Sequence, residues 1–163
     1  MLRHVQRRCA GTGTDNFCQN GSDDPSVIFS LIALFVGIIN PKNGILTYVN
    51  CGNERPFVGR AGKDVTILQA TGPVVGIFPW AKYAIQETCI DDGDLLLVFT
   101  DGIPDARNEA NQEYGKEPVM KKMSNRSDSA AILLEEMVAD LQGFIGSAEQ
   151  FDDITLLAIR RGE

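Results

Sequence analysis

The amino-acid sequence predicts an α+β domain in which a mainly antiparallel sheet precedes most of the helical structure. Between residues 27 and 99, apolar or alternating stretches of strand length are separated by turns that carry glycine, asparagine or proline. Clear helical periodicity appears only after residue 113. Because neighbouring strands joined by short turns form hairpins, most of the sheet is expected to be antiparallel. The 163 residues, 44% of them hydrophobic, suffice for one domain with a sizeable core.

The first expected strand pair is a hairpin. Residues 30–39 are largely apolar, and residues 45–50 alternate enough to be the return strand. The Asn43-Gly44 pair between them is a strong signal for a tight turn. Further short strands are expected at residues 57–58, 65–68 and 83–90.

The central strand is an unbroken apolar run at residues 95–99, which predicts burial on both faces. It ends in Thr100-Asp101-Gly102. A carboxylate at the end of a buried strand, followed by a glycine that allows close backbone approach, can hold a cation or a phosphate group. The alternative is that Asp101 only begins a turn.

A second acidic stretch has the reverse arrangement, because Asp152 and Asp153 come before an apolar run that ends at Arg160. If the two runs pair antiparallel, Asp101 lies beside Asp152 and Asp153 at one edge of the sheet. Clustered carboxylates repel each other unless a proton or a cation stabilises them, and hard divalent cations take such oxygen ligands. An acidic edge that only keeps the protein soluble is the alternative. We favour a metal site.

The helical part lies towards the C-terminus. A short helix is expected at residues 113–123, interrupted near Pro118, and a second at residues 129–142, capped by Ser127 or Asp128. One apolar face of the second helix is predicted to pack on the sheet, formed by Leu133, Met137, Leu141 and Phe144.

The N-terminal residues 1–26 are rich in glycine, asparagine and aspartate and predict an irregular segment before a domain at residues 27–163. Within this segment, residues 3–8 are interpreted as the tail of a helix. The net charge of −7 argues against binding to nucleic acids or acidic membranes. No apolar run approaches the roughly 20 residues that span a bilayer, and no signal peptide is recognised, so a cytoplasmic location is expected.

The four cysteines, Cys9, Cys18, Cys51 and Cys89, have no metal-binding spacing, and His4 is the only histidine. A zinc site and Ser-His-Asp chemistry are therefore not indicated. Cys51 and Cys89 lie in or beside strand-like segments and are expected to be small core residues.

Five stretches, taken in order, resemble the C-terminal two-thirds of the metal-dependent Ser/Thr protein phosphatases, the PPM superfamily. They are similar to its bacterial branch of SpoIIE- and RsbU-type sigma-factor regulators. The stretches are residues 34–44, 48–52 (Tyr-Val-Asn-Cys-Gly), 71–78 (Thr-Gly-Pro-Val-Val-Gly-Ile-Phe), 92–102 (ending Phe-Thr-Asp-Gly) and 151–155 (Phe-Asp-Asp-Ile-Thr). The resemblance implies a PPM-phosphatase-like α/β sandwich, in which two mostly antiparallel sheets pack together with helices on the outside.

The resemblance also implies a site and a reaction. In the family, two Mn²⁺ or Mg²⁺ ions activate a water that attacks phosphoserine or phosphothreonine directly. By position, Asp101 and Asp152 match the catalytic metal ligands of the family's Thr-Asp-Gly and Asp-Asp motifs. Asp153 is then a supporting partner or an alternative ligand. The implied substrate is a phosphorylated protein of the anti-sigma-factor antagonist type.

Three departures from the family pattern stand out. Asn53 replaces the family's common histidine after Gly52 and cannot titrate near neutral pH, and Asp105 stands where glutamate is usual. The family's first strands, with an aspartate that bridges both metals, have no recognisable counterpart in residues 1–29.

The domain is therefore interpreted as N-terminally truncated, with one weak metal site, little activity in isolation, and open sheet edges that favour a homodimer. The alternative function is a catalytically impaired phosphatase-like module that binds a regulatory partner. An acidic structural domain without a site is a third interpretation.

Overall fold

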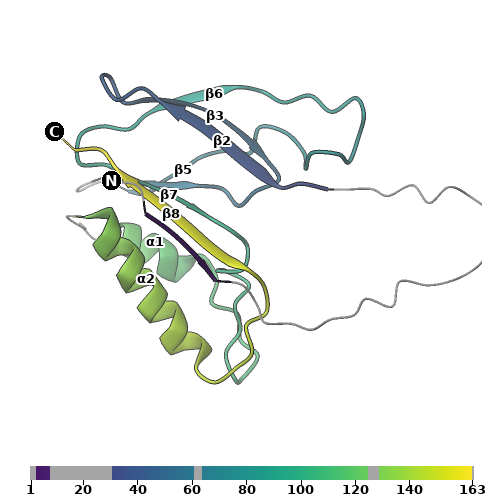
Figure 1. Ribbon diagram of the computed structural model, residues 1–163, viewed down its shortest axis with the longest axis vertical. Helices are drawn as coiled ribbons and strands as arrows, with labels where there is room; N and C mark the ends of the chain where they lie inside the picture. Colours follow the sequence, from purple (N-terminus) through teal and green to yellow (C-terminus); the bar gives the residue numbers. More distant parts are fainter. Residues whose placement is uncertain (1–2, 8–30, 61–63, 125–128, 163) are drawn as a thin grey trace, which may run out of the picture.

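A computed structural model of the chain describes residues 3–7, 31–60, 64–124 and 129–162, with only the backbone for residues 3–7. Two sheets pack face to face, and both helices lie on the outer side of the larger sheet (Figure 1). The larger sheet has five strands in the order β1-β8-β7-β4-β5, and the smaller has three in the order β2-β3-β6. All pairs of neighbouring strands are antiparallel. The predicted α+β sandwich is confirmed.

The strands of the larger sheet are β1 (Arg3–Arg7), β4 (Phe57–Gly59), β5 (Thr66–Ile67), β7 (Leu95–Phe99) and β8 (Ile154–Arg160). Those of the smaller sheet are β2 (Leu34–Ile39), β3 (Ile45–Cys51) and β6 (Gln86–Cys89). The helices are α1 (Glu117–Ser124) and α2 (Ala130–Ile145). Neither helix in these described residues is long and apolar enough to span a membrane.

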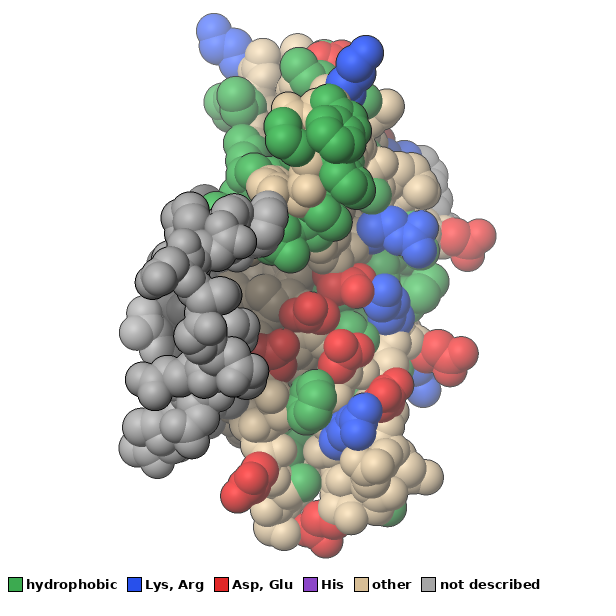
Figure 2. All heavy atoms as spheres, turned by 90° about the vertical axis from the view of Figure 1, so that its right-hand side faces the viewer, with side chains coloured by type: hydrophobic (Ala, Val, Ile, Leu, Met, Phe, Trp, Pro, Cys, Tyr) green, Lys and Arg blue, Asp and Glu red, His purple; other side chains and the backbone are tan. Residues whose placement is uncertain are grey.

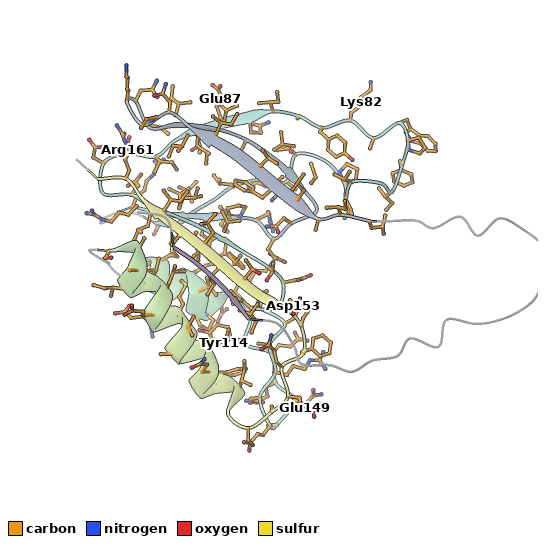
Figure 3. All side chains as sticks on the ribbon, viewed as in Figure 1. Lys82, Glu87, Tyr114, Glu149, Asp153 and Arg161 are labelled. Atoms are coloured by element: carbon orange, nitrogen blue, oxygen red, sulfur yellow. The ribbon has the colours of Figure 1, made fainter. Side chains whose placement is uncertain are left out.

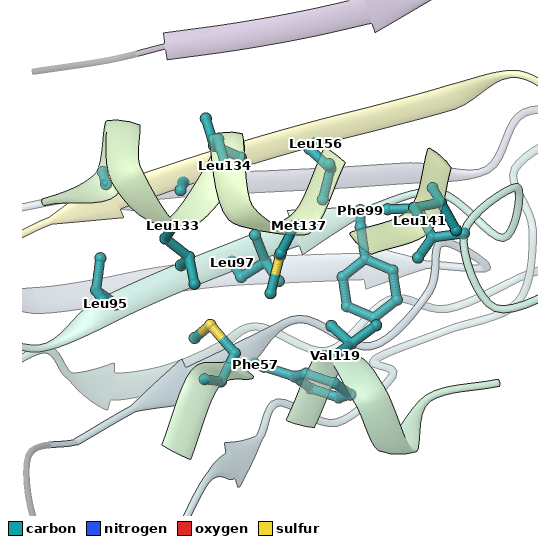
Figure 4. Packing of buried hydrophobic residues seen from close by; sticks show 14 of the residues in the cluster. Phe57, Leu95, Leu97, Phe99, Val119, Leu133, Leu134, Met137, Leu141 and Leu156 are labelled. Atoms are coloured by element: carbon teal, nitrogen blue, oxygen red, sulfur yellow. The ribbon is translucent and has the colours of Figure 1, made fainter. Parts of the chain in front are cut away.

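Strand β7 is buried on both faces, as its unbroken apolar run predicts. Leu95, Leu97 and Phe99 belong to the core between the larger sheet and the helices (Figure 4). Leu96 points the other way, into the core between the two sheets. Successive side chains of a strand alternate between faces, so one apolar run supplies both cores. This central position fixes where β7 ends, and therefore where the acidic residues behind it lie.

Helix α2 confirms the expected amphipathic helix. Ser129 caps it, because its Oγ accepts a hydrogen bond from the backbone N–H of Ala131 at 3.1 Å. The caps expected at residues 127 and 128 lie outside the described residues. Gly146, with a φ of 61°, ends the helix. The buried face of α2 consists of Ala130, Leu133, Leu134, Met137 and Leu141 (Figure 4).

Helix α1 is shorter than expected. Pro118 lies in its first turn and does not interrupt a longer helix. A proline is tolerated there because the first backbone N–H groups of a helix have no intrahelical partner. The helix expected from residue 113 therefore begins only at Glu117.

The interpretation of residues 3–8 as a helix tail is wrong. Residues 3–7 form β1, which pairs antiparallel with β8 from Arg3↔Ala158 to Arg7↔Ile154. The pairing satisfies the backbone groups on the side of β8 that faces away from β7. Residues 8–26 of the predicted irregular segment, with Cys9 and Cys18, lie outside the described residues.

The smaller sheet differs from expectation in one core residue. Cys51 is buried as expected, but Cys89 is exposed, as is Ile45, the residue that it pairs with on β3. On β2, the side chains of Leu34, Val36 and Ile38 are also exposed. Both described helices lie on the far side of the larger sheet (Figure 1). The homodimer expected from open sheet edges stays a prediction.

Candidate functional site

The two acidic stretches meet where β7 ends and β8 begins. Thr100, directly after β7, donates a hydrogen bond from its Oγ1 to the backbone oxygen of Asp153 at 2.9 Å. The same Oγ1 accepts a hydrogen bond from the backbone N–H of Thr155 at 3.0 Å. The threonine of the Thr-Asp-Gly motif thus holds the chain directly before Asp101 against the start of β8.

Gly102 sets how closely the acidic stretches approach. A Cβ atom at this position would lie 2.5 Å from the carbonyl oxygen of Asp153 and 3.4 Å from the carbonyl carbon of Asp152. Real Cβ contacts of 2.5 Å do not occur, so the position requires glycine if the backbones are to stay in contact. Gly102 thus allows a contact between the backbones of the two acidic segments, and its approach to a cation or phosphate stays a prediction.

The side chains of Asp101, Asp152 and Asp153 are all exposed at this edge. Acidic side chains gather on this end of the molecule (Figure 2), where Asp153 is labelled in Figure 3. The Asp152 carboxylate accepts a hydrogen bond from the backbone N–H of Asp153 at 2.7 Å, and the side-chain amide of Gln150 donates to the Asp152 carbonyl at 2.7 Å. These bonds shape the acidic turn before β8.

Carboxylate oxygens are the donors that Mg²⁺ and Mn²⁺ prefer, and Mg²⁺ usually keeps several waters. The donor chemistry of the edge therefore fits a hydrated ion. Among the described residues, however, no group of three or more His, Cys, Asp or Glu side chains is arranged to hold a metal. The edge alone does not make a two-ion site, and the ligand roles of Asp101, Asp152 and Asp153 stay predictions.

Asn53, which stands where the family commonly has histidine, is a structural clamp. Its Nδ2 donates to the carbonyl of Phe99 at 3.2 Å and to that of Glu54 at 2.8 Å. Its backbone N–H donates to the Oδ1 of Asn50, a side chain with 0% exposure. Asn53 therefore ties the loop after β3 to the last residue of β7, two positions before Asp101.

Sequence reasoning missed two residues around this edge. Asn50 lies on the buried face of β3 with Leu46 and Tyr48. A polar residue at a position where the alternating pattern of the strand places buried side chains was the signal that could have identified it. Arg107 places its guanidinium carbon 5.0 Å from the ring centre of Phe151, the residue before Asp152. No local pattern marks that contact.

Arg107 is itself held in place within the loop that follows Gly102. Its guanidinium donates to the Oδ1 of Asn111 and to the Oε1 of Glu113, each at 3.1 Å. Asn111 adopts a φ of 58°, in the left-handed region that asparagine tolerates better than most residues. The cation therefore bridges the loop after β7 and the loop before β8.

A two-sheet sandwich with an acidic edge at the ends of its central strands is the architecture of a PPM-type phosphatase domain. Residues 2–162 match the family described as Stage II sporulation protein E (SpoIIE). The chain belongs to this family, and it is a SpoIIE/RsbU-type PPM domain.

Two curated relatives are similar to the chain. Protein IcfG of Synechocystis sp. is 34% identical over 128 residues, which cover 78% of this chain and 20% of that protein. Phosphoserine phosphatase RsbU of Bacillus subtilis is 29% identical over 135 residues, which cover 80% of this chain and 39% of that protein. The chain thus spans less than half the length of either relative.

Among solved structures, the Mn-presoaked phosphatase domain of the cell fate determinant SpoIIE from Bacillus subtilis has the same fold. The TM-score is 0.63 at 20% sequence identity, and the match covers 80% of this chain and 57% of that chain.

Proposed function

We propose that this domain is a Mn²⁺- or Mg²⁺-dependent protein serine/threonine phosphatase. Its proposed substrate is a phosphorylated regulatory protein of the anti-sigma-factor antagonist type, and its proposed location is the cytoplasm. The observation that carries the proposal is the contact of Gly102 with the Asp152-Asp153 backbone, in a chain of the SpoIIE family. That contact supports a site to which both acidic stretches contribute. The name of the relative RsbU, a phosphoserine phosphatase, supports the substrate class.

In this proposal Asp101 and Asp152 ligate the metal, and Asp153 supports Asp152 or replaces it as a ligand. A bound divalent ion would lower the pKa of a coordinated water and neutralise charge on the phosphoryl group. Thr100 and Gly102 keep the two acidic loops in contact. A third carboxylate, histidine or cysteine ligand would come from outside the described residues or from a second chain, since the part that the structure describes holds no group of three such side chains.

The experiment is hydrolysis of an aryl phosphate with and without Mn²⁺, for the wild type, Asp101→Asn and Asp105→Asn. Asp105 is the matched control, because it is an exposed aspartate on the same loop and has no proposed ligand role. We expect Mn²⁺-dependent turnover that Asp101→Asn abolishes and Asp105→Asn preserves. Turnover that is independent of Mn²⁺, or equal in the two variants, would contradict the proposed site.

A folded wild-type protein without turnover would refute the claim that this chain alone is an enzyme. That outcome would support the alternative, a phosphatase-like module that binds its regulatory partner without catalysis. Circular dichroism of each protein shows whether it is folded.

A further inference from the structure

A loop between β5 and β6 presents several exposed apolar side chains. In residues 77–83, which we call the aromatic loop, these are Ile77, Phe78, Trp80 and Tyr83, and Trp80 is 75% exposed. The rings of Phe78 and Trp80 stack with centroids 5.5 Å apart and planes 22° from parallel. Clustered exposed apolar side chains of this kind mark interaction surfaces more often than single ones do.

The base of the aromatic loop is fixed. The Thr71 Oγ1 accepts a hydrogen bond from the backbone N–H of Asn50 at 2.8 Å, and the Thr71 backbone N–H donates to the Asn50 carbonyl at 2.8 Å. On the returning side, the backbone N–H of Ala84 donates to the Thr71 carbonyl at 2.9 Å. On the outgoing side, Val75 and Ile32 exchange two backbone hydrogen bonds of 3.0 Å each. These hydrogen bonds hold the two segments that flank the aromatic loop.

The same hydrogen-bond network reaches the acidic edge. Asn50 accepts from the backbone of Asn53, and Asn53 donates to the carbonyl of Phe99 at the end of β7. Two polar side chains, those of Asn50 and Asn53, thus connect the base of the aromatic loop to the last residue of β7, two positions before Asp101. The base of the aromatic loop and the end of β7 therefore share one hydrogen-bond network.

Both features lie at the same end of the sandwich. In Figure 3, Lys82, in the aromatic loop, lies to the right of β6 in the upper layer, and Asp153 lies at the right-hand end of β8 in the lower layer. Seen from that end, hydrophobic side chains gather in the upper part of the molecule and acidic side chains below them (Figure 2). A ligand that extends beyond a phosphate group can therefore touch both regions.

We propose that the aromatic loop is the docking surface for the folded protein that carries the phosphorylated residue. An apolar patch of that partner binds Phe78 and Trp80, while its phosphorylated side chain reaches the acidic edge. This inference rests on the proposed function and names how its substrate is recognised. Tryptophan is enriched among interface residues that dominate binding energy, and a pre-stacked ring pair loses little freedom on binding.

The charge of the chain limits which contacts can bind this partner. The chain carries a net charge of −7, and the candidate site is an exposed acidic edge, so long-range attraction for an anionic phosphoprotein is absent. Affinity for such a partner must then come from short-range contacts, and the aromatic loop offers apolar ones. The same net charge disfavours an anionic membrane surface as the occupant.

The test measures binding of a purified, phosphoserine-carrying anti-sigma-factor antagonist by isothermal titration calorimetry. Trp80→Ala is expected to weaken binding by about tenfold or more, as loss of an interface hot spot does. The matched control is Ile38→Ala, because Ile38 is 73% exposed on β2, outside the aromatic loop. The control is expected to bind within about twofold of the wild type, as surface substitutions away from special features usually do.

Each other outcome overturns the inference. No binding by the wild type, or equal binding by the wild type and Trp80→Ala, removes the aromatic loop as a docking surface. An equal loss of Mn²⁺-dependent aryl phosphate turnover in Trp80→Ala would mean that the substitution disturbs the acidic edge instead. Trp80-dependent association with phosphatidylglycerol vesicles, without any effect on the protein partner, would assign the loop to a membrane.

The proposed function can fail separately. Absence of aryl phosphate turnover in the wild type refutes the enzyme, but the calorimetric comparison of Trp80→Ala with Ile38→Ala still decides the docking surface.

Discussion

Gly102→Ala is the sharpest test of how the two acidic stretches meet. The new Cβ would lie 2.5 Å from the Asp153 carbonyl oxygen, which is backbone and cannot turn away as a side chain can. One of the two loops must move by roughly 1 Å before this contact reaches 3.4 Å, where ordinary van der Waals contacts begin. Overpacking of this kind costs about 1–3 kcal/mol of unfolding free energy. The same movement separates Asp101 from Asp152 and lowers the affinity for any cation that the two carboxylates bind together.

Urea unfolding measures the stability loss, and Mn²⁺ titration followed by electron paramagnetic resonance measures metal binding. Gly143→Ala is the matched control, because Gly143 lies in α2 and has no atom within 4 Å of its virtual Cβ. In a helix, alanine is favoured over glycine by about 0.5–1 kcal/mol, so this control should be more stable than the wild type. If Gly102→Ala equals the wild type in both stability and Mn²⁺ affinity, the reasoning about the contact is refuted.

Three further predictions concern the cap of α2, the contact of Arg107 with Phe151 and the pair of Tyr114 and Asp140. Ser129→Ala removes the cap of α2 and should cost about 1 kcal/mol in urea unfolding; an unchanged midpoint would contradict the capping role. Arg107→Ala removes the contact with Phe151 and should cost about 0.5–1 kcal/mol in urea unfolding; Arg107→Lys, which keeps a cation near the ring, should restore part of that loss, and an unchanged midpoint in Arg107→Ala would contradict the role of the contact. The Tyr114 hydroxyl donates to Asp140 and, with Lys122 nearby, holds the pKa of that carboxyl below its usual value. A carboxyl whose pKa is lower in the folded protein stabilises the fold at pH values above its unfolded pKa, and this stabilisation is lost as the pH falls through the folded pKa. Tyr114→Phe should therefore show a smaller decrease in unfolding free energy at acid pH than the wild type, measured by urea unfolding at a series of pH values. An identical acid profile for both proteins would refute that role.

The acidic edge was predictable because its signals are local. An apolar run that ends in Thr-Asp-Gly, and another that begins after Asp-Asp, define the ends of β7 and β8 without knowledge of any other contact. The observed register, with Phe99 opposite Leu156, follows once the two runs pair antiparallel. The glycine at position 102 was also readable, since a glycine beside a carboxylate indicates close backbone approach.

The missed features depend on residues that lie far apart in the chain. Arg107 meets Phe151 across 44 positions, and Asn53 bonds to Phe99 across 46, so no local pattern records either pair. Strand β1 was missed because its five residues alternate weakly and pair only with the side of β8 left free by β7. The exposed stack of Phe78 and Trp80 was not predicted, because exposure cannot be deduced from a short apolar segment.

The asparagine at position 53 shows how this chain uses a family position in another way. The Asn53 amide carries two N–H donors, and both are used, one on Phe99 and one on Glu54. A neutral histidine has a single N–H donor and could satisfy only one of these carbonyls at a time. The position therefore acts in this chain as a non-titrating clamp between two loops. Because the clamp also bonds to Asn50, which holds Thr71, it gives the acidic edge and the aromatic loop a common support.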